Sequence, residues 1–131
     1  MVTDWRLWIT QAEHDLNDAK SNLSVCCYSV CVFLCQQAIE KGLKALLMVQ
    51  KGEEPPRIHS LRTLCHVTGF EPNDTKTLIM IDRAYTATRY PDTMEWNGES
   101  VLEEKDAREA LRVTTDILQA ITTRIEEHNA T

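Results

Sequence analysis

The stretch from Cys26 to Lys51 constrains the fold more than any other part of the sequence. It is uncharged until Glu40 and rich in apolar residues. Placed on a helix at about 100° per residue, the second half carries Gln37, Lys41 and Lys44 on the side opposite an apolar stripe. A central helix that also lines a site or an interface has this layout, although solvated lysines would give the same pattern. The stripe consists of Tyr28, Val32, Cys35, Ile39, Leu43 and Leu46.

Length and composition predict one domain over residues 1–131. Hydrophobic residues make up 43% of the chain, which is enough for a core and too much for a disordered protein. The four glycines and four prolines offer few breaks, so long helices are favoured. No apolar run reaches the ~18 residues of a membrane span. The N-terminus has no secretory signal pattern, so we expect a cytoplasmic protein without membrane contact.

The five cysteines include three at helical spacing, Cys27, Cys31 and Cys35. An odd total without a bridging framework fits reduced thiols in a cytoplasm. A thiolate metal site on this helix is conceivable, but small hydrophobic side chains in a packed core are the preferred interpretation. We therefore expect no metal and no cofactor.

The net charge of −6 argues against a broad nucleic-acid-binding surface. The charge is uneven, and the segment from Glu40 to His66 is the only net-positive block. This block could meet a small anionic ligand or an acidic patch of a partner. Chance asymmetry on a solvated surface is the alternative.

Helical periodicity and capping signals predict four longer helices and one short one. The first begins near Thr3 or Asp4 and ends before a turn at residues 21–24. The second runs to about Lys51, where Gly52 ends it. The short third helix has Ser60 as its cap and ends at Gly69.

The fourth helix is predicted over about residues 76–89. Asp74 or Thr75 caps it, and Pro91 disfavours helical geometry at the residue before it. Residues 93–98 are predicted as a loop, and a capping box from Ser100 to Glu103 opens the last helix. The predicted class is an all-α, up-and-down antiparallel helical bundle.

Several motifs in order along the chain then support a family resemblance. Gln36-Gln37-Ala38 precedes Glu40-Lys41 and Leu43-Lys44-Ala45-Leu46, and His59-Ser60-Leu61 and Arg89-Tyr90-Pro91-Asp92 follow. In this combination the chain resembles small stand-alone HEPN proteins (higher eukaryotes and prokaryotes nucleotide-binding). The resemblance implies a helical bundle that dimerises. It also implies a role in binding nucleotides or in working beside a minimal nucleotidyltransferase, often as a toxin–antitoxin pair.

Many HEPN proteins are ribonucleases with an arginine and, after a spacer of four to six positions, a histidine. This sequence lacks that motif, because Arg62 and His66 are one residue too close, as are Arg124 and His128. Arg89 has no histidine within reach. We therefore do not expect an enzyme, and a metal-independent ribonuclease using an off-pattern pair such as Arg62 and His66 stays as an alternative.

Where the resemblance and the positive block meet, we predict a ligand-binding site. Lys41 and Lys44 could face phosphate as point charges, and Arg89 could bind phosphate bidentately. Gln37 could make an amide contact. In the structural alternative, Lys41 pairs with Glu40 or with a partner chain.

Three further residues complete this predicted site. His59 could bond phosphate through its imidazole, Tyr85 could stack on a base, and Asp92 could orient Arg89 or accept from a ribose. Each also has a structural alternative. His59 could tether a loop, Tyr85 could belong to the core, and Asp92 could form a salt bridge with Arg89.

The sequence thus predicts a homodimeric binding module for a nucleotide-like anion or a nucleotidyltransferase partner. A purely structural dimerisation or adaptor domain is a further alternative. The polar side of helix two could instead face a second subunit, and Val30, Phe33, Leu34 and Met48 would then supply the apolar contact.

Overall fold

In a computed structural model of the chain, residues 3–89 and 102–130 are described, apart from the side chains of residues 86–89. These residues form five α-helices and no strand, as the predicted all-α class with one short helix requires. No helix within this part of the chain has both the length and the apolar character needed to cross a membrane. The helices are α1 (Trp5–Ser24), α2 (Tyr28–Lys51), α3 (Leu61–Thr68), α4 (Thr75–Arg89) and α5 (Glu104–Asn129).

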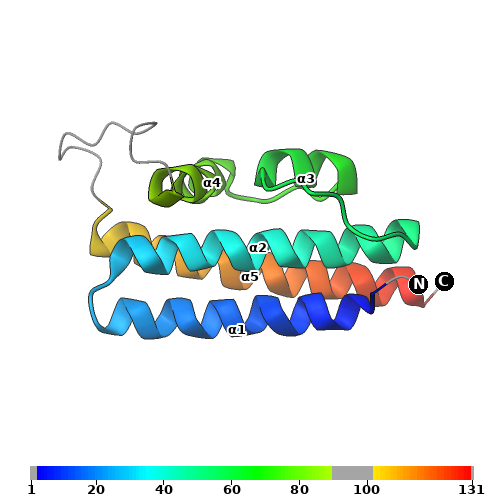
Figure 1. Ribbon diagram of the computed structural model, residues 1–131, viewed down its shortest axis with the longest axis horizontal. Helices are drawn as coiled ribbons and strands as arrows, with labels where there is room; N and C mark the ends of the chain where they lie inside the picture. Colours follow the sequence, from blue (N-terminus) through cyan, green and yellow to red (C-terminus); the bar gives the residue numbers. More distant parts are fainter. Residues whose placement is uncertain (1–2, 90–101, 131) are drawn as a thin grey trace.

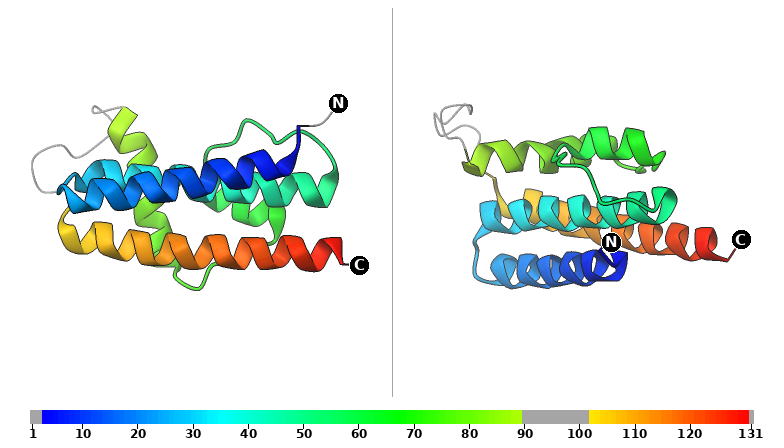
Figure 2. Two further views of the ribbon diagram at one scale, coloured as in Figure 1. Left: turned by 90° about the horizontal axis from the view of Figure 1, so that it is seen from below. Right: turned by 45° about the vertical axis from the view of Figure 1, so that its right-hand side comes forward.

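Helix α2 lies at the centre of the fold and contacts each of the other four helices. Helix α1 runs antiparallel to α2 and to α5, as the colours along the chain show (Figure 1). Helices α3 and α4 form a layer on the opposite side of α2 from α1, and α4 crosses over the long helices (Figure 2). The central position follows from the sequence of α2, which is apolar on most of its circumference.

The predicted apolar stripe of α2 is the core of the fold. Val32, Cys35, Ile39, Leu43 and Leu46 are all buried. Cys31 is also buried, so two of the clustered cysteines pack as small hydrophobic side chains, whereas Cys27 is exposed.

Gly42 allows α2 and α5 to approach each other closely. A Cβ atom at this position would lie 2.8 Å from Leu118 Cδ2 and 3.2 Å from Ile121 Cδ1. Both contacts are tighter than ordinary packing allows, so a larger side chain at this position would have to displace the Leu118 and Ile121 side chains of α5.

Four predicted helix ends are confirmed. Gly52 ends α2 with a left-handed φ of 66°, and its N–H donates to the Met48 carbonyl at 2.7 Å. Ser60 caps α3, and Gly69 ends it with φ 73°. Asp74 accepts hydrogen bonds from the backbone and hydroxyl of Thr77, which lower the pKa of this carboxyl and cap α4.

The turn predicted at residues 21–24 is wrong, because α1 continues through Ser24. Ser21 and Asn22 bond carbonyl groups one turn earlier, so their polar side chains are accommodated within the helix. The chain instead turns at residues 25–27, where Cys26 adopts a positive φ of 63°.

The capping box predicted from Ser100 to Glu103 is also wrong. Helix α5 begins one residue after Glu103, which is its N-cap. The Asp106 carboxylate accepts a hydrogen bond from the Glu103 N–H at 2.8 Å. The reciprocal pair is therefore shifted by three residues. The loop predicted at 93–98 lies outside the described residues.

Candidate functional site

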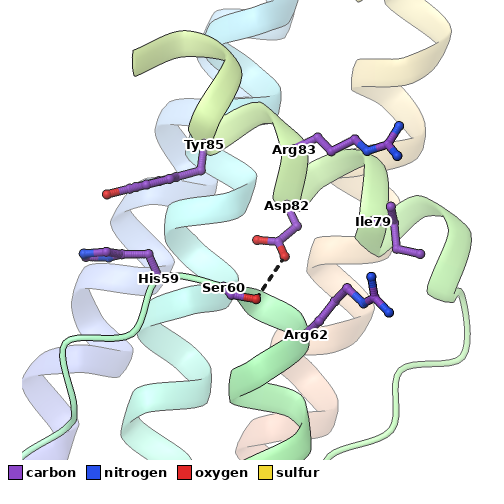
Figure 3. A pocket seen from close by; sticks show the side chains of 7 residues that line it. All are labelled: His59, Ser60, Arg62, Ile79, Asp82, Arg83 and Tyr85. Atoms are coloured by element: carbon purple, nitrogen blue, oxygen red, sulfur yellow. Dashed lines mark hydrogen bonds between the residues drawn. The ribbon is translucent and has the colours of Figure 1, made fainter. Parts of the chain in front are cut away.

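A cavity of about 430 Å³ opens between α3 and α4 (Figure 3). Asp82 of α4 fastens the start of α3, because its carboxylate accepts from the Leu61 N–H at 3.0 Å and from the Ser60 hydroxyl at 3.5 Å. This cross-link holds the two helices at the distance that leaves the cavity between them. The lining residues are His59, Ser60, Arg62, Ile79, Asp82, Arg83 and Tyr85.

Two arginines, Arg62 and Arg83, give this cavity its positive charge. Both side chains are exposed, and neither forms an ion pair with any residue in the described ranges. In Figure 3 both guanidinium groups extend to the same side of Asp82. Guanidinium groups bind phosphate and carboxylate through paired hydrogen bonds.

His59 and Tyr85 form the other end of the cavity. Their rings stack with centroids 5.1 Å apart and an interplanar angle of 16° (Figure 3). Tyr85 also stacks on Phe33 at 6.4 Å. The His59 side chain is 52% exposed, so the aromatic pair faces solvent at its histidine end.

Beneath His59 lies a buried polar network centred on Glu40. The Glu40 carboxylate accepts from Lys44 Nζ at 2.9 Å and from Gln36 Nε2 at 3.2 Å, and its Oε2 lies 3.1 Å from His59 Nδ1. The side chains of Glu40 and Lys44 are only 9% and 6% exposed. The Lys44 ammonium also lies 5.8 Å from the ring centroid of Trp8 on α1.

Of the seven predicted site residues, the structure brings His59 and Tyr85 together at this cavity. Gln37 lies elsewhere, and its amide donates to Gln36 Oε1 at 2.6 Å. Lys41 pairs with Asp15 at 2.7 Å.

The remaining predicted residues are placed as follows. Lys44 is buried against Glu40, so it is not the solvated lysine of the alternative interpretation. Lys41 pairs with Asp15 and not with Glu40, as the other alternative had it. Arg89 ends α4, but its side chain and Asp92 lie outside the described residues.

The sequence does not point to Arg62 and Arg83 as members of the binding site. Arg62 enters the sequence prediction as one cation of the net-positive block and as half of a nuclease pair, but not as a named site residue. It lines the cavity, whereas His66 does not. Arg83 lies at helical spacing from Ile79, on the α4 face that meets the start of α3. That spacing is visible in the sequence, but the docking of α4 on α3 is not.

The other described candidates offer less to a ligand. A second cavity, of about 490 Å³, lies beside α5, but its Arg112 is already paired with Asp74, Glu109 and Asp116. Burial and then the charge of Asp82 raise the pKa of the Cys65 thiol to about 11, so this thiol stays protonated. Within residues 3–89 and 102–130, no three His, Cys, Asp or Glu side chains are grouped to hold a metal ion.

A family model for the HEPN domain matches residues 5–125. The chain belongs to the HEPN family. Solved structures agree with this assignment. TT1696 from Thermus thermophilus shares 27% identity with a TM-score of 0.75, over 92% of this chain and 97% of that one. ST0689, an archaeal HEPN homologue, shares 32% identity with a TM-score of 0.73, over 94% and 98% of the two chains. The comparison with curated proteins finds no match.

Proposed function

We propose that this HEPN chain is a binding module that recognises a nucleotide-like anion in the cavity between α3 and α4. The observation that carries the proposal is the pair Arg62 and Arg83. Two guanidinium groups without an ion-pair partner among the described residues share one cavity, in a chain whose net charge is −6. Such a local concentration of cations attracts an anion even when the whole protein is acidic.

The two ends of the cavity suit two parts of a nucleotide. Phosphate oxygens would bond the guanidinium groups of Arg62 and Arg83. At the other end, a hydroxyl or amine of the ligand would bond His59, and a base would lie against the exposed end of the His59–Tyr85 stack. Asp82, between the two ends, has acceptor capacity left for a ligand hydroxyl.

We further propose that the module is a single-domain, cytoplasmic homodimer, with a minimal nucleotidyltransferase as a candidate partner. Val30 is 46% exposed on α2, and Phe33 and Leu34 are half-buried beside it, so these three can supply an apolar contact. Met48 cannot, because it is 4% exposed and belongs to the core. The proposal of this partner is based on the family resemblance alone.

A thermal-shift screen against AMP, ADP, ATP, GTP and inorganic phosphate tests the proposal. A ligand at about 100 times its dissociation constant should add roughly 2.7 kcal/mol of apparent stability. The Arg62→Ala/Arg83→Ala variant should lose this shift. The Arg6→Ala/Arg108→Ala variant, which removes the same charge from α1 and α5, should keep it.

Two outcomes of this screen would contradict the proposal. The first is a well-folded wild-type protein that responds to no nucleotide. The second is a nucleotide shift that both double variants lose equally, since this would assign the effect to overall charge.

A further inference from the structure

The buried pair of Glu40 and Lys44 is an unusual feature of the core. Burying two charges costs several kcal/mol of desolvation for each ion, and apolar side chains of the same size are often as stable or more stable. Both charged groups lie within one helix, so the pair does not hold α2 to another helix. Stability alone therefore gives little reason for a carboxylate at this position.

The Glu40 network leads directly to the proposed ligand site. Glu40 Oε2 bonds the His59 ring at Nδ1, and the Gln36 amide bonds both Glu40 Oε1 and the His59 carbonyl oxygen, the latter at 3.1 Å. Glu40 and Gln36, on successive turns of α2, thus hold the side chain and the backbone of His59. Stacking on Tyr85 restrains the ring further.

The chemistry of this contact fixes the state of the imidazole. An ionised carboxylate only accepts hydrogen bonds, so the neutral His59 ring must carry its proton on Nδ1 to bond Glu40. Its Nε2 then has a free lone pair. Because half of this side chain is exposed, Nε2 is the ring nitrogen left for a ligand.

We propose that Glu40 is a positioning residue, whose buried carboxylate holds His59 in the Nδ1-protonated tautomer and presents Nε2 as an acceptor for a hydroxyl or amine of the ligand. The ligand part of this inference rests on the proposed function. The tautomer part does not, because it concerns the free protein. Lys44 then serves to compensate the charge of this carboxylate in the core.

Imidazole ¹⁵N spectra of the ligand-free protein at pH 8 test the tautomer. His59, assigned by the loss of its signals in His59→Gln, should show a protonated Nδ1 and an unprotonated Nε2. The exposed His14 and His66 provide internal comparisons and should show the mixed tautomers of free imidazole. In a Glu40→Leu/Lys44→Met variant, which keeps the net charge, His59 should show the same mixture as those two residues. A wild-type His59 protonated on Nε2, or a variant that keeps the Nδ1 tautomer, would overturn the proposal.

Titrations with AMP and with inorganic phosphate test the ligand part. The same double variant should bind AMP about tenfold more weakly, which corresponds to roughly one hydrogen bond. It should bind inorganic phosphate unchanged, because Arg62 and Arg83 are intact. Equal AMP affinity in the two proteins would overturn the positioning role. If the wild type binds none of the nucleotides in the thermal-shift screen, the proposed function fails. The tautomer of His59 in the free protein then decides by itself whether Glu40 positions this ring.

Discussion

Two lysines one helical turn apart on α2, Lys41 and Lys44, form ion pairs in different surroundings. Lys41 pairs with Asp15 of α1, and the two side chains are 24% and 13% exposed, so this contact joins two helices near solvent. Lys44 pairs with Glu40 of its own helix, almost without exposure, and shares the carboxylate with His59. Lys41 therefore fastens a neighbouring helix, whereas Lys44 compensates the carboxylate that also bonds His59.

The largest effect on stability should come from removing only the cation of the buried pair. Lys44→Met leaves the Glu40 carboxylate in the core without its main partner, and we expect a loss of about 3 kcal/mol in the free energy of unfolding. Urea unfolding followed by circular dichroism measures it. A loss below about 1 kcal/mol would mean that water or His59 compensates Glu40 as well as Lys44 does.

Removing both buried charges should cost much less. In Glu40→Leu/Lys44→Met no buried charge remains unpaired, so we expect stability within about 1 kcal/mol of the wild type, with an unchanged urea m-value. The two variants share Lys44→Met and differ only at Glu40, so their difference in stability measures the cost of leaving the carboxylate unpaired. If the double variant were as unstable as the single one, the buried pair would be needed for stability, and its proposed role in positioning His59 would lose its main argument.

The partly buried pair of Lys41 and Asp15 should contribute about 1 kcal/mol or less to stability, and this contribution should depend on salt. For Lys41→Met we expect a loss of about 0.5–1 kcal/mol that shrinks as salt is raised, because partly exposed charges are screened. Unfolding at low and high sodium chloride measures this. A salt-independent loss as large as that of Lys44→Met would remove the distinction between the two pairs.

The smallest effect on stability is expected at the cavity. Arg62→Ala/Arg83→Ala removes two exposed side chains without an ion-pair partner in the described structure, so the free energy of unfolding should change by about 0.5 kcal/mol or less. Removing two nearby like charges could even stabilise the free protein slightly. A loss above about 1 kcal/mol would give these arginines a structural role instead of a binding role.

The fold was predictable because its signals are local. Gly52, Ser60 and Gly69 mark helix ends through their own backbone and hydroxyl chemistry. Asp74 does the same for α4. The start of α5 was mispredicted because Ser100 and Glu103 form an equally good capping sequence, and only the packed structure selects Glu103 with Asp106.

The site was less predictable because it depends on tertiary contacts. The spacing of Glu40 and Lys44 allows a salt bridge, but the burial of that pair beside Trp8 and His59 needs the positions of α1 and the segment before α3. Arg83 and Arg62 are separated along the chain and meet only because Asp82 fastens α4 to the start of α3. Helical periodicity does not contain that information.

Mapping AMP binding onto backbone amide resonances tests the central claim most directly, since it locates the ligand without assuming a site. We predict that the largest chemical-shift changes fall in residues 59–62 and 82–85, on the two walls of the α3–α4 cavity. Changes concentrated around Lys41 and Asp15, or beside α5 in the second cavity, would contradict the account. A spectrum that stays unchanged at millimolar AMP, and equally with ADP, ATP and GTP, would also contradict it.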